Sequence, residues 1–301
     1  MPAVFADPKT DFVFKRIFGT EAHKDLLIAL LNHLLELEGG HQIASVEFLS
    51  PEQHVSVPEL KLSIVDVKCT DVLGHRFVVE MQVLKVEGFE KRVVYNASKA
   101  YVMQLRNADE YPTLCNVVGV TICNFNLWPE KNASGQYNVP MLSRWHMAER
   151  HNGQQGLPQI QYAFLELPKY AAGTAPQTLI EKWAYFFREA KNLDVVPASL
   201  SEGPFREALE VTRKSAFSAE EWELYERAKM AEQDARGALS IARQEGELKG
   251  RRDVLLRLLS RSGITLTDDE QARVATCTDS ALLDQWIENA FSAKHAAEVL
   301  T

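Results

Sequence analysis

Two carboxylates stand in the middle of two apolar, β-branched segments that are typical of strands in a protein core. The segments are joined in the sequence IVDVKCTDVLGHRFVVEMQV, residues 64–83, which holds Asp66 in its first half and Glu80 in its second. If the turn centres near Leu73, a hairpin places Asp66 across from Glu80, with Cβ atoms roughly 5 Å apart. Two bare carboxylates at that distance repel by roughly 3 kcal/mol at an effective dielectric constant of about 20. A hard divalent cation such as Mg²⁺ would offset this repulsion, because it prefers carboxylate oxygens and keeps several water molecules for chemistry.

Alternation along the two strands predicts what each face of the hairpin carries, because successive side chains point to opposite faces. One face is expected to be wholly apolar, and from the second strand it carries Phe77, Val79, Met81 and Val83. The opposite face holds four polar side chains, which are Asp66, Lys68, Glu80 and Gln82.

Two interpretations of the polar face are open at this point. In an ordinary half-exposed hairpin, Asp66 would pair with Lys68 or Arg76 and Glu80 would be solvated. In the second interpretation, the acids look into a cleft. The apolar character of both strands, and the helix that is expected from residue 90, favour the cleft.

The elements that must position these residues follow from periodicity and from turn residues. We expect a mixed α/β sheet, because the hairpin is antiparallel whereas a helical crossover favours a parallel pair. The expected order is a helix within 21–40 that stops at Gly39-Gly40, a strand at 43–51, the hairpin at 64–83, a helix at 90–111, a buried strand at 114–128 and a hairpin around the polar loop 150–158.

The composition changes near residue 176, and the rest of the chain is dense in helix-forming residues. We expect a boundary at 172–178, which separates a core of residues 1–175 from a helical C-terminal region of residues 176–301. The last short helices are each expected to begin at a Thr, Asp or Ser that can cap the helix. An Ala-rich helix in this region predicts a homodimer through helix pairing.

Net charge and cysteine content restrict the functional classes. The chain has 301 residues and a formal net charge of −8, which argues against a protein that coats nucleic acid by bulk charge. A nuclease stays possible, since a divalent ion can supply local positive charge. The four cysteines, at positions 69, 115, 123 and 277, show no metal-ligand spacing and predict reduced thiols in a cytoplasmic protein. No signal peptide and no 18-residue apolar run is found in the sequence, so we expect no membrane association.

An Asp in one strand, a short hairpin and Glu-x-Gln in the next strand together resemble the PD-(D/E)XK nuclease superfamily, with Gln in place of the last Lys. Three further blocks resemble the Rpn family of recombination-promoting nucleases or putative transposases. They are DPKTDFVFKRIFG at 7–19 with Asp11, Phe14, Lys15, Phe18 and Gly19, LLIALLNHLL with Asn32, and KRVVYNASKAYVMQL. The Ala-, Glu- and Arg-rich helix of the C-terminal region and the stretch ALLDQWIENAF also resemble that family, so the blocks occur in the family's order over nearly the whole chain.

The resemblance implies a restriction-endonuclease-like core and metal-dependent hydrolysis of DNA phosphodiester bonds, with no organic cofactor. Asp66 and Glu80 would be the ligands of Mg²⁺ or Mn²⁺. Gln82 would orient the attacking water and touch the scissile phosphate. Because Gln carries no charge, the metal would stabilise more of the developing negative charge, which predicts a stricter metal dependence than in a Lys-bearing enzyme.

Other residues keep two interpretations each. Asp11 could approach the metal from the first helix or could be the N-cap of that helix. Lys15, Lys68 and Arg92 could contact phosphates or could form solvated charges and local ion pairs. For the whole protein, the alternative to an endonuclease is a catalytically silent protein of a mobile element that keeps the nuclease fold for binding or oligomerisation.

Overall fold

The computed structural model describes residues 4–53, 63–105 and 110–301. Contacts divide the chain into two compact units, Met1–Lys229 and Met230–Thr301. The segment 172–178, where we expected a boundary, lies inside the first unit. The helices that follow this segment pack into the same core as the N-terminal helices.

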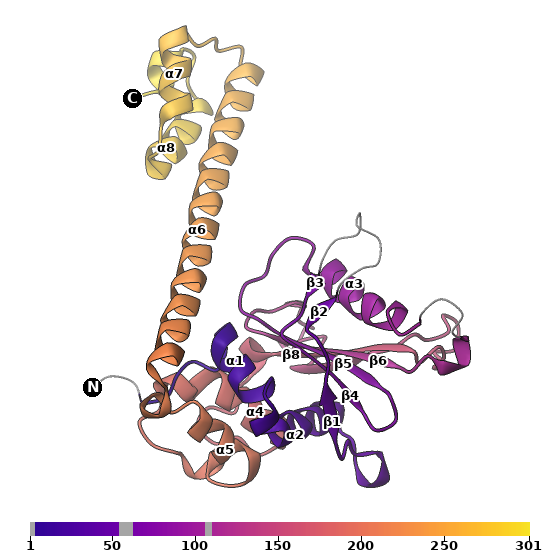
Figure 1. The fold of residues 1–301 in the computed structure, drawn as a ribbon. Helices are drawn as coiled ribbons and strands as arrows, with labels where there is room; N and C mark the ends of the chain where they lie inside the picture. The colour runs from indigo at the N-terminus through magenta and orange to yellow at the C-terminus, as the bar shows by residue number, and fades with distance from the viewer. Residues whose placement is uncertain (1–3, 54–62, 106–109) are drawn as a thin grey trace. The chain divides into compact units, whose positions relative to one another are not determined.

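A six-stranded sheet forms the centre of the first unit, in the order β1-β4-β5-β6-β8-β7 (Figure 1). The parallel strands β5, β6 and β8 lie in the middle, and antiparallel pairs flank them on both sides. This arrangement confirms the expected mixed sheet. The strands are β1 (Val46–Phe48), β4 (Val67–Asp71), β5 (Arg76–Gln82), β6 (Val117–Cys123), β7 (Leu142–Trp145) and β8 (Ile160–Glu166), and a separate pair consists of β2 (Glu52–Gln53) and β3 (Ser63–Ile64).

The β4–β5 hairpin has the predicted register. Val67 pairs with Val79 and Thr70 with Arg76, so the turn centres on Leu73. The carboxylate of Asp71 closes this turn, because it accepts hydrogen bonds from the backbone N–H groups of Leu73 and His75 at 2.9 Å each. The ring of His75 contacts the same carboxylate, so this histidine belongs to the turn.

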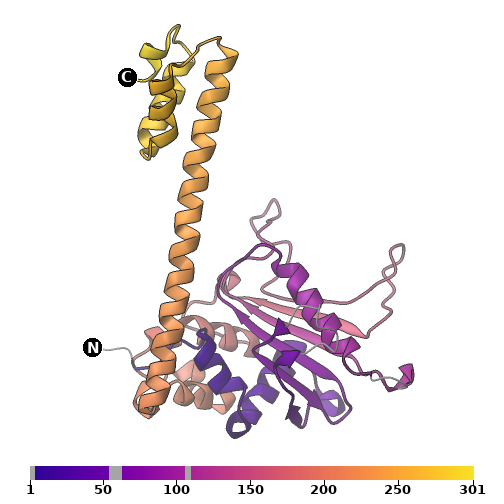
Figure 2. The same ribbon diagram turned by 45° about the horizontal axis from the view of Figure 1, so that its top comes forward.

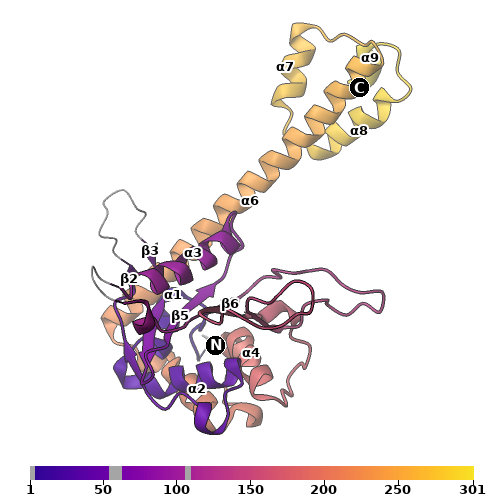
Figure 3. The ribbon, with the colours of Figure 1, turned by 90° about the vertical axis from the view of Figure 1, so that its right-hand side faces the viewer.

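Helices cover both faces of the sheet (Figure 3). Helix α3 (Phe89–Val102) covers the face that carries Val78, which packs against Ala97 and Ala100. The opposite face carries Phe77, Val79 and Met81 and joins the main hydrophobic core. The helices of that core include α1 (Asp11–Phe18), α2 (Lys24–Leu35), α4 (Leu179–Glu189) and α5 (Gly203–Val211).

Two predicted helices end earlier than expected. Helix α2 ends at Leu35, because Glu36 adopts a left-handed conformation with φ of 50° and the N–H groups of Glu36 and Leu37 close the last turn. The Gly39-Gly40 pair therefore follows the end of the helix by several residues. Helix α3 ends at Val102, although its helical pattern extends to residue 111.

The second unit has a hydrophobic core of its own. It contains most of α6 (Ala219–Arg261), together with α7 (Asp268–Thr276), α8 (Ser280–Ala290) and α9 (Ala296–Val299), which gather near the end of α6 (Figure 2). This core centres on Trp286, Leu255 and Leu283. No helix in the described part of the chain is both long enough and apolar enough to span a bilayer.

The expected N-caps are confirmed in two of the three C-terminal helices. Thr267 caps α7 in a capping box with Glu270, and Asp279 caps α8 by accepting two backbone hydrogen bonds. The expectation of a serine cap is wrong for the third helix. Helix α9 follows His295, whose side chain makes no capping bond.

We predict that Gly74→Ala weakens the β4–β5 hairpin. Gly74 has φ of +82°, and a Cβ atom at this position would lie 2.6 Å from the Sγ atom of Cys115. Backbone strain and overpacking together should lower the free energy of unfolding by about 2–4 kcal/mol. Urea unfolding followed by circular dichroism measures this change.

Gly135→Ala is the matched control, since Gly135 has φ of +78° but no atom within 4 Å of the added Cβ. It should cost only the strain of the left-handed conformation, about 1 kcal/mol. Equal losses in the two variants would contradict a role for the contact with Cys115.

Candidate active site

The register of the β4–β5 hairpin brings Asp66 and Glu80 together. Asp66 lies just before β4, next to Val67, whose partner in β5 is Val79, and it is close enough to Glu80 for the charge of Glu80 to act on it. Its Oδ2 atom accepts a hydrogen bond of 2.7 Å from the backbone N–H of Met81. Glu80 is only 5% exposed, and its Oε1 atom accepts a bond of 2.6 Å from the side-chain amide of Asn96 on α3.

The environment disfavours negative charge on both carboxylates. Burial raises the pKa of Asp66 to about 7, and the nearby charges of Asp11 and Glu80 add to the increase, whereas the Met81 N–H and Lys15 oppose it. Burial also raises the pKa of Glu80, against the hydrogen bond from Asn96 and the charge of Arg92. The site therefore holds two acids whose negative charge the protein compensates only in part.

The interpretation as an ordinary half-exposed hairpin, with Asp66 paired to Lys68 or Arg76 and Glu80 solvated, does not fit the structure. Among the charged groups that act on Asp66 in the described residues, neither Lys68 nor Arg76 appears. Lys68 is itself only 5% exposed, and its pKa is lowered by burial and by the charges of Arg76 and Lys99. The burial of Lys68 and Glu80 agrees with an enclosed polar face beneath α3.

Asp11 is not a helix cap. Thr10 occupies the N-cap position of α1, and Asp11 is the first residue of the helix. The Asp11 carboxylate lies 2.6 Å from the Nζ atom of Lys15, and 61% of its side chain is exposed. Its charge acts on Asp66, so the first helix does bring a third carboxylate toward the pair.

Gln82 lies at the end of β5, on the same face as Glu80. Its Oε1 atom accepts a hydrogen bond of 2.5 Å from Nη2 of Arg92 on α3. The backbone N–H of Asn124, just after β6, donates to the backbone carbonyl oxygen of Gln82 at 2.8 Å. Gln82 is therefore held at the carboxyl end of the parallel strands.

Asn96 is not among the site residues predicted from the sequence. Its place in the helical pattern was the available signal, since it shares a helix face with Val93, Ala97 and Ala100, which are all buried. A polar residue on an apolar helix face usually has a buried hydrogen-bond partner. Here the partner is Glu80, so α3 positions one of the two acids directly.

The residues present fit a divalent cation that keeps part of its water shell. The Oδ1 atom of Asp66 and the Oε2 atom of Glu80 make no hydrogen bond with any described residue. In the described part of the chain, no three His, Cys, Asp or Glu side chains gather closely enough to enclose a metal ion. Such a donor set matches Mg²⁺, which is often held by one or two carboxylates together with waters and substrate phosphates.

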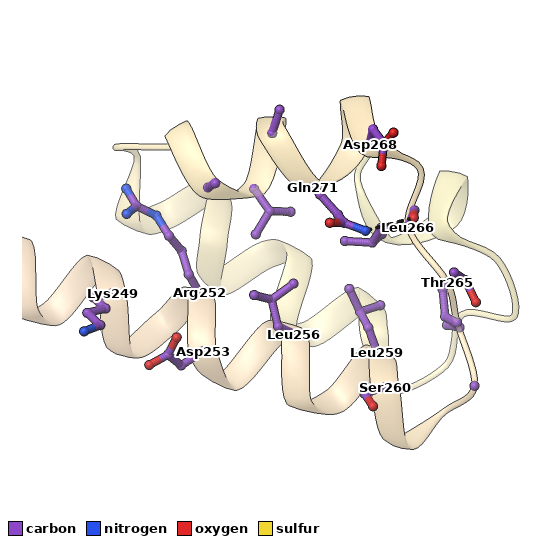
Figure 4. A pocket seen from close by; sticks show the side chains of 15 residues that line it. Lys249, Arg252, Asp253, Leu256, Leu259, Ser260, Thr265, Leu266, Asp268 and Gln271 are labelled. Carbon is purple, nitrogen blue, oxygen red and sulfur yellow. Dashed lines mark hydrogen bonds between the residues drawn. The ribbon is translucent and has the colours of Figure 1, made fainter.

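A pocket of about 870 Å³ lies elsewhere, within the second unit (Figure 4). Leu256, Leu259 and Leu266 line its apolar part. Two of its polar side chains are engaged with backbone carbonyls, because Arg252 donates to Cys277 and Gln271 donates to Leu266. We place the candidate site at Asp66 and Glu80 because the desolvated acid pair, rather than pocket size, has the chemistry of an active site.

Comparison with known proteins finds a family match for most of the chain. A family model described as "PD-(D/E)XK nuclease family transposase" matches residues 8–242. The matched span contains Asp11, Asp66, Glu80 and Gln82, together with the sheet and the helices around it. No curated protein and no solved structure matches the chain.

We predict that Asp66→Asn stabilises the metal-free protein, and that the gain is larger at pH 8 than at pH 5. A carboxyl group whose pKa is raised on folding binds its proton more tightly in the folded state. The contribution of Asp66 to stability therefore falls as the pH rises from about 4 to about 7, and asparagine removes this loss. Thermal unfolding in EDTA at the two pH values measures the difference.

Asp25→Asn serves as the control, because Asp25 is exposed on α2 and should show no comparable gain. Equal gains for Asp66→Asn at pH 5 and pH 8 would contradict the raised pKa of Asp66.

Proposed function

The chain belongs to the PD-(D/E)XK nuclease family transposases, and on that premise we propose that it is a metal-dependent DNA endonuclease. The observation that carries this proposal is the desolvated pair of acids, Asp66 and Glu80. Holding two partly compensated carboxylates on a covered face of the sheet destabilises a fold. A cation that binds between them would relieve this cost.

Each of the two acids accepts a hydrogen bond from a different group of the protein, as metal ligands commonly do. We propose that Asp66 and Glu80 hold Mg²⁺ or Mn²⁺, and that Asp11 is a third, more exposed acid for the same site. When bound, such an ion lowers the pKa of a coordinated water and polarises the phosphoryl group. The Met81 N–H and the Asn96 amide each occupy one oxygen of a carboxylate and thereby fix its orientation.

The reaction is hydrolysis of a phosphodiester. The oxygen of a water molecule forms a bond to phosphorus, the bond between phosphorus and one sugar oxygen breaks, and that sugar oxygen leaves with a proton. Recombination, transposition-related processes and defence are settings in which a chain of this family would need such cleavage.

Basic residues near the carboxyl edge of the parallel strands support DNA as the substrate. A cleft of about 280 Å³ is lined by Lys9, Arg188 and Lys191, together with Asn124 and Glu189. The backbone N–H of Asn124 donates to Gln82, so this cleft reaches the same edge as the candidate site. Each of these bases is already in an ion pair, Lys9 and Lys191 with Asp7 and Arg188 with Glu189, so only part of their charge is left for a phosphate backbone.

We predict that the wild type nicks supercoiled plasmid with Mg²⁺ or Mn²⁺ and not with EDTA. Asp66→Asn and Glu80→Gln should each reduce the rate by at least about 100-fold, since even residues that only support metal ligands contribute 10–100-fold. Glu47→Gln, at an exposed acid of β1 in the same sheet, should cleave like the wild type. Thermal unfolding verifies that each variant is folded.

A wild type that stays inactive with both metals, and that takes up neither metal in calorimetry, would contradict the proposal. The catalytically silent protein that serves binding or oligomerisation would then become the better explanation.

Helix α6 supports a homodimer. Five alanines recur at heptad spacing along one stripe, and they are Ala228, Ala231, Ala235, Ala238 and Ala242. Residues 233–247 are all exposed. A bare helix of this kind gains little stability without packing on a partner.

Charge complementarity favours a second copy of the chain as the partner of this stripe. Residues 220–234 hold six acids and two bases, whereas residues 236–252 hold five bases and two acids. Two copies of the helix in antiparallel orientation would place each acidic half against a basic half, and the alanines would allow a close approach.

We predict a concentration-dependent dimer in sedimentation velocity, which Ala235→Arg weakens by placing a bulky charge on the stripe. Gln233→Arg adds the same charge off the stripe and should leave the dimer unchanged. A monomer at all concentrations would exclude this pairing.

A further inference from the structure

The side chain of Gln82, at the end of β5, is hydrogen-bonded to Arg92. Its partner Arg92 lies in the first turns of α3, ten residues further along the chain. In the sequence, Gln82 takes the place of a lysine and leaves the site without that lysine's charge. In the fold, a guanidinium group reaches this position from the helix.

The direction of this hydrogen bond determines the orientation of the Gln82 side-chain amide. A guanidinium group has donors and no acceptor, so the carbonyl oxygen of the Gln82 amide must face Arg92. The NH₂ group of the same amide then remains for another molecule. Gln82 can therefore donate to a phosphate oxygen, and its Oε1 atom keeps a second lone pair that can accept a hydrogen bond from an attacking water.

Arg92 is held in place without being neutralised. Its guanidinium carbon lies 5.7 Å from the ring centroid of Phe89, which is only 2% exposed. Among the described residues, no carboxylate forms an ion pair with Arg92, and only one of its N–H groups is used by Gln82. Its charge also acts on Glu80, so the guanidinium group lies close to the acid pair.

We infer that Arg92 and Gln82 together form a binding site for a DNA phosphate group, in which Arg92 supplies the positive charge that the glutamine lacks. This inference rests on the proposed nuclease function and adds a residue to its substrate site. Arg92 both contacts the phosphate and positions the amide of Gln82. The charge that develops on the phosphate during cleavage is thus stabilised by the protein as well as by a metal ion.

The kinetic test uses four variants and plasmid cleavage with Mg²⁺. Arg92→Ala should lower kcat by about 100-fold, the loss that is typical of one transition-state donor, with a smaller change in KM. Arg92→Lys should retain part of the activity. Gln82→Lys combined with Arg92→Ala should recover at least about tenfold of the loss, because the lysine restores a charge beside the phosphate.

Lys91→Ala is the matched control, since Lys91 is an exposed base on the same helix and should leave kcat unchanged. A merely structural role for Arg92 would leave the double variant no more active than Arg92→Ala. Such a result, in folded proteins, would overturn the inference.

A second measurement does not depend on cleavage. Binding of a fluorescein-labelled duplex in EDTA is followed by anisotropy across a series of salt concentrations. Arg92→Ala should reduce the slope of log K against log salt by about 0.9, the value for one lost phosphate contact. Lys91→Ala should change the slope by less.

The two measurements separate the two ways in which the proposals can fail. An inactive wild type whose slope still falls with Arg92→Ala would contradict the nuclease and support the phosphate site. An active wild type with an unchanged slope and kcat in Arg92→Ala would overturn the phosphate site alone. A wild type that neither cleaves nor binds DNA would overturn both.

Discussion

The desolvation of Asp66 and Glu80 is the constraint on which the arrangement of the first unit depends. Glu80 is buried and Asp66 is half-buried. Removing such carboxylates from water is unfavourable, and the structure offsets this only in part with the Met81 N–H and the Asn96 amide. A fold selected for stability alone would place apolar side chains at these positions. Partly compensated negative charge at these positions is what the proposed metal site requires.

The β4–β5 hairpin determines where the two acids lie. Its turn is closed by Asp71 and requires the left-handed conformation of Gly74, and together these residues set the register that brings the acids near each other. The apolar face of the hairpin is anchored in the main core. As a result, the hairpin cannot rotate its acids out into water without exposing Val79 and Met81.

Helix α3 completes the polar face. It contributes Val93 and Ala97 to packing, Asn96 to the orientation of Glu80, and Arg92 to the side chain of Gln82. Packing and chemistry thus use the same helix, with the deeper residues of α3 buried on the sheet and Arg92 at its exposed side. The second unit is built differently, around Trp286 and the end of α6, and its apolar pocket has no comparable pair of desolvated acids among its lining residues.

The sequence by itself determined the hairpin, its register, the separation of its faces and the pairing of Asp66 with Glu80, because strand alternation and turn residues act over a few positions. Only the tertiary structure decided that Asn96 and Arg92 serve those residues, since the crossover to α3 and the packing of α3 on the sheet bring separate segments together. It also decided that Thr10 rather than Asp11 caps α1, and that α4 and α5 join the core of the first unit. These outcomes depend on which surfaces pack against one another, and the periodicity of one segment carries no information about its partner.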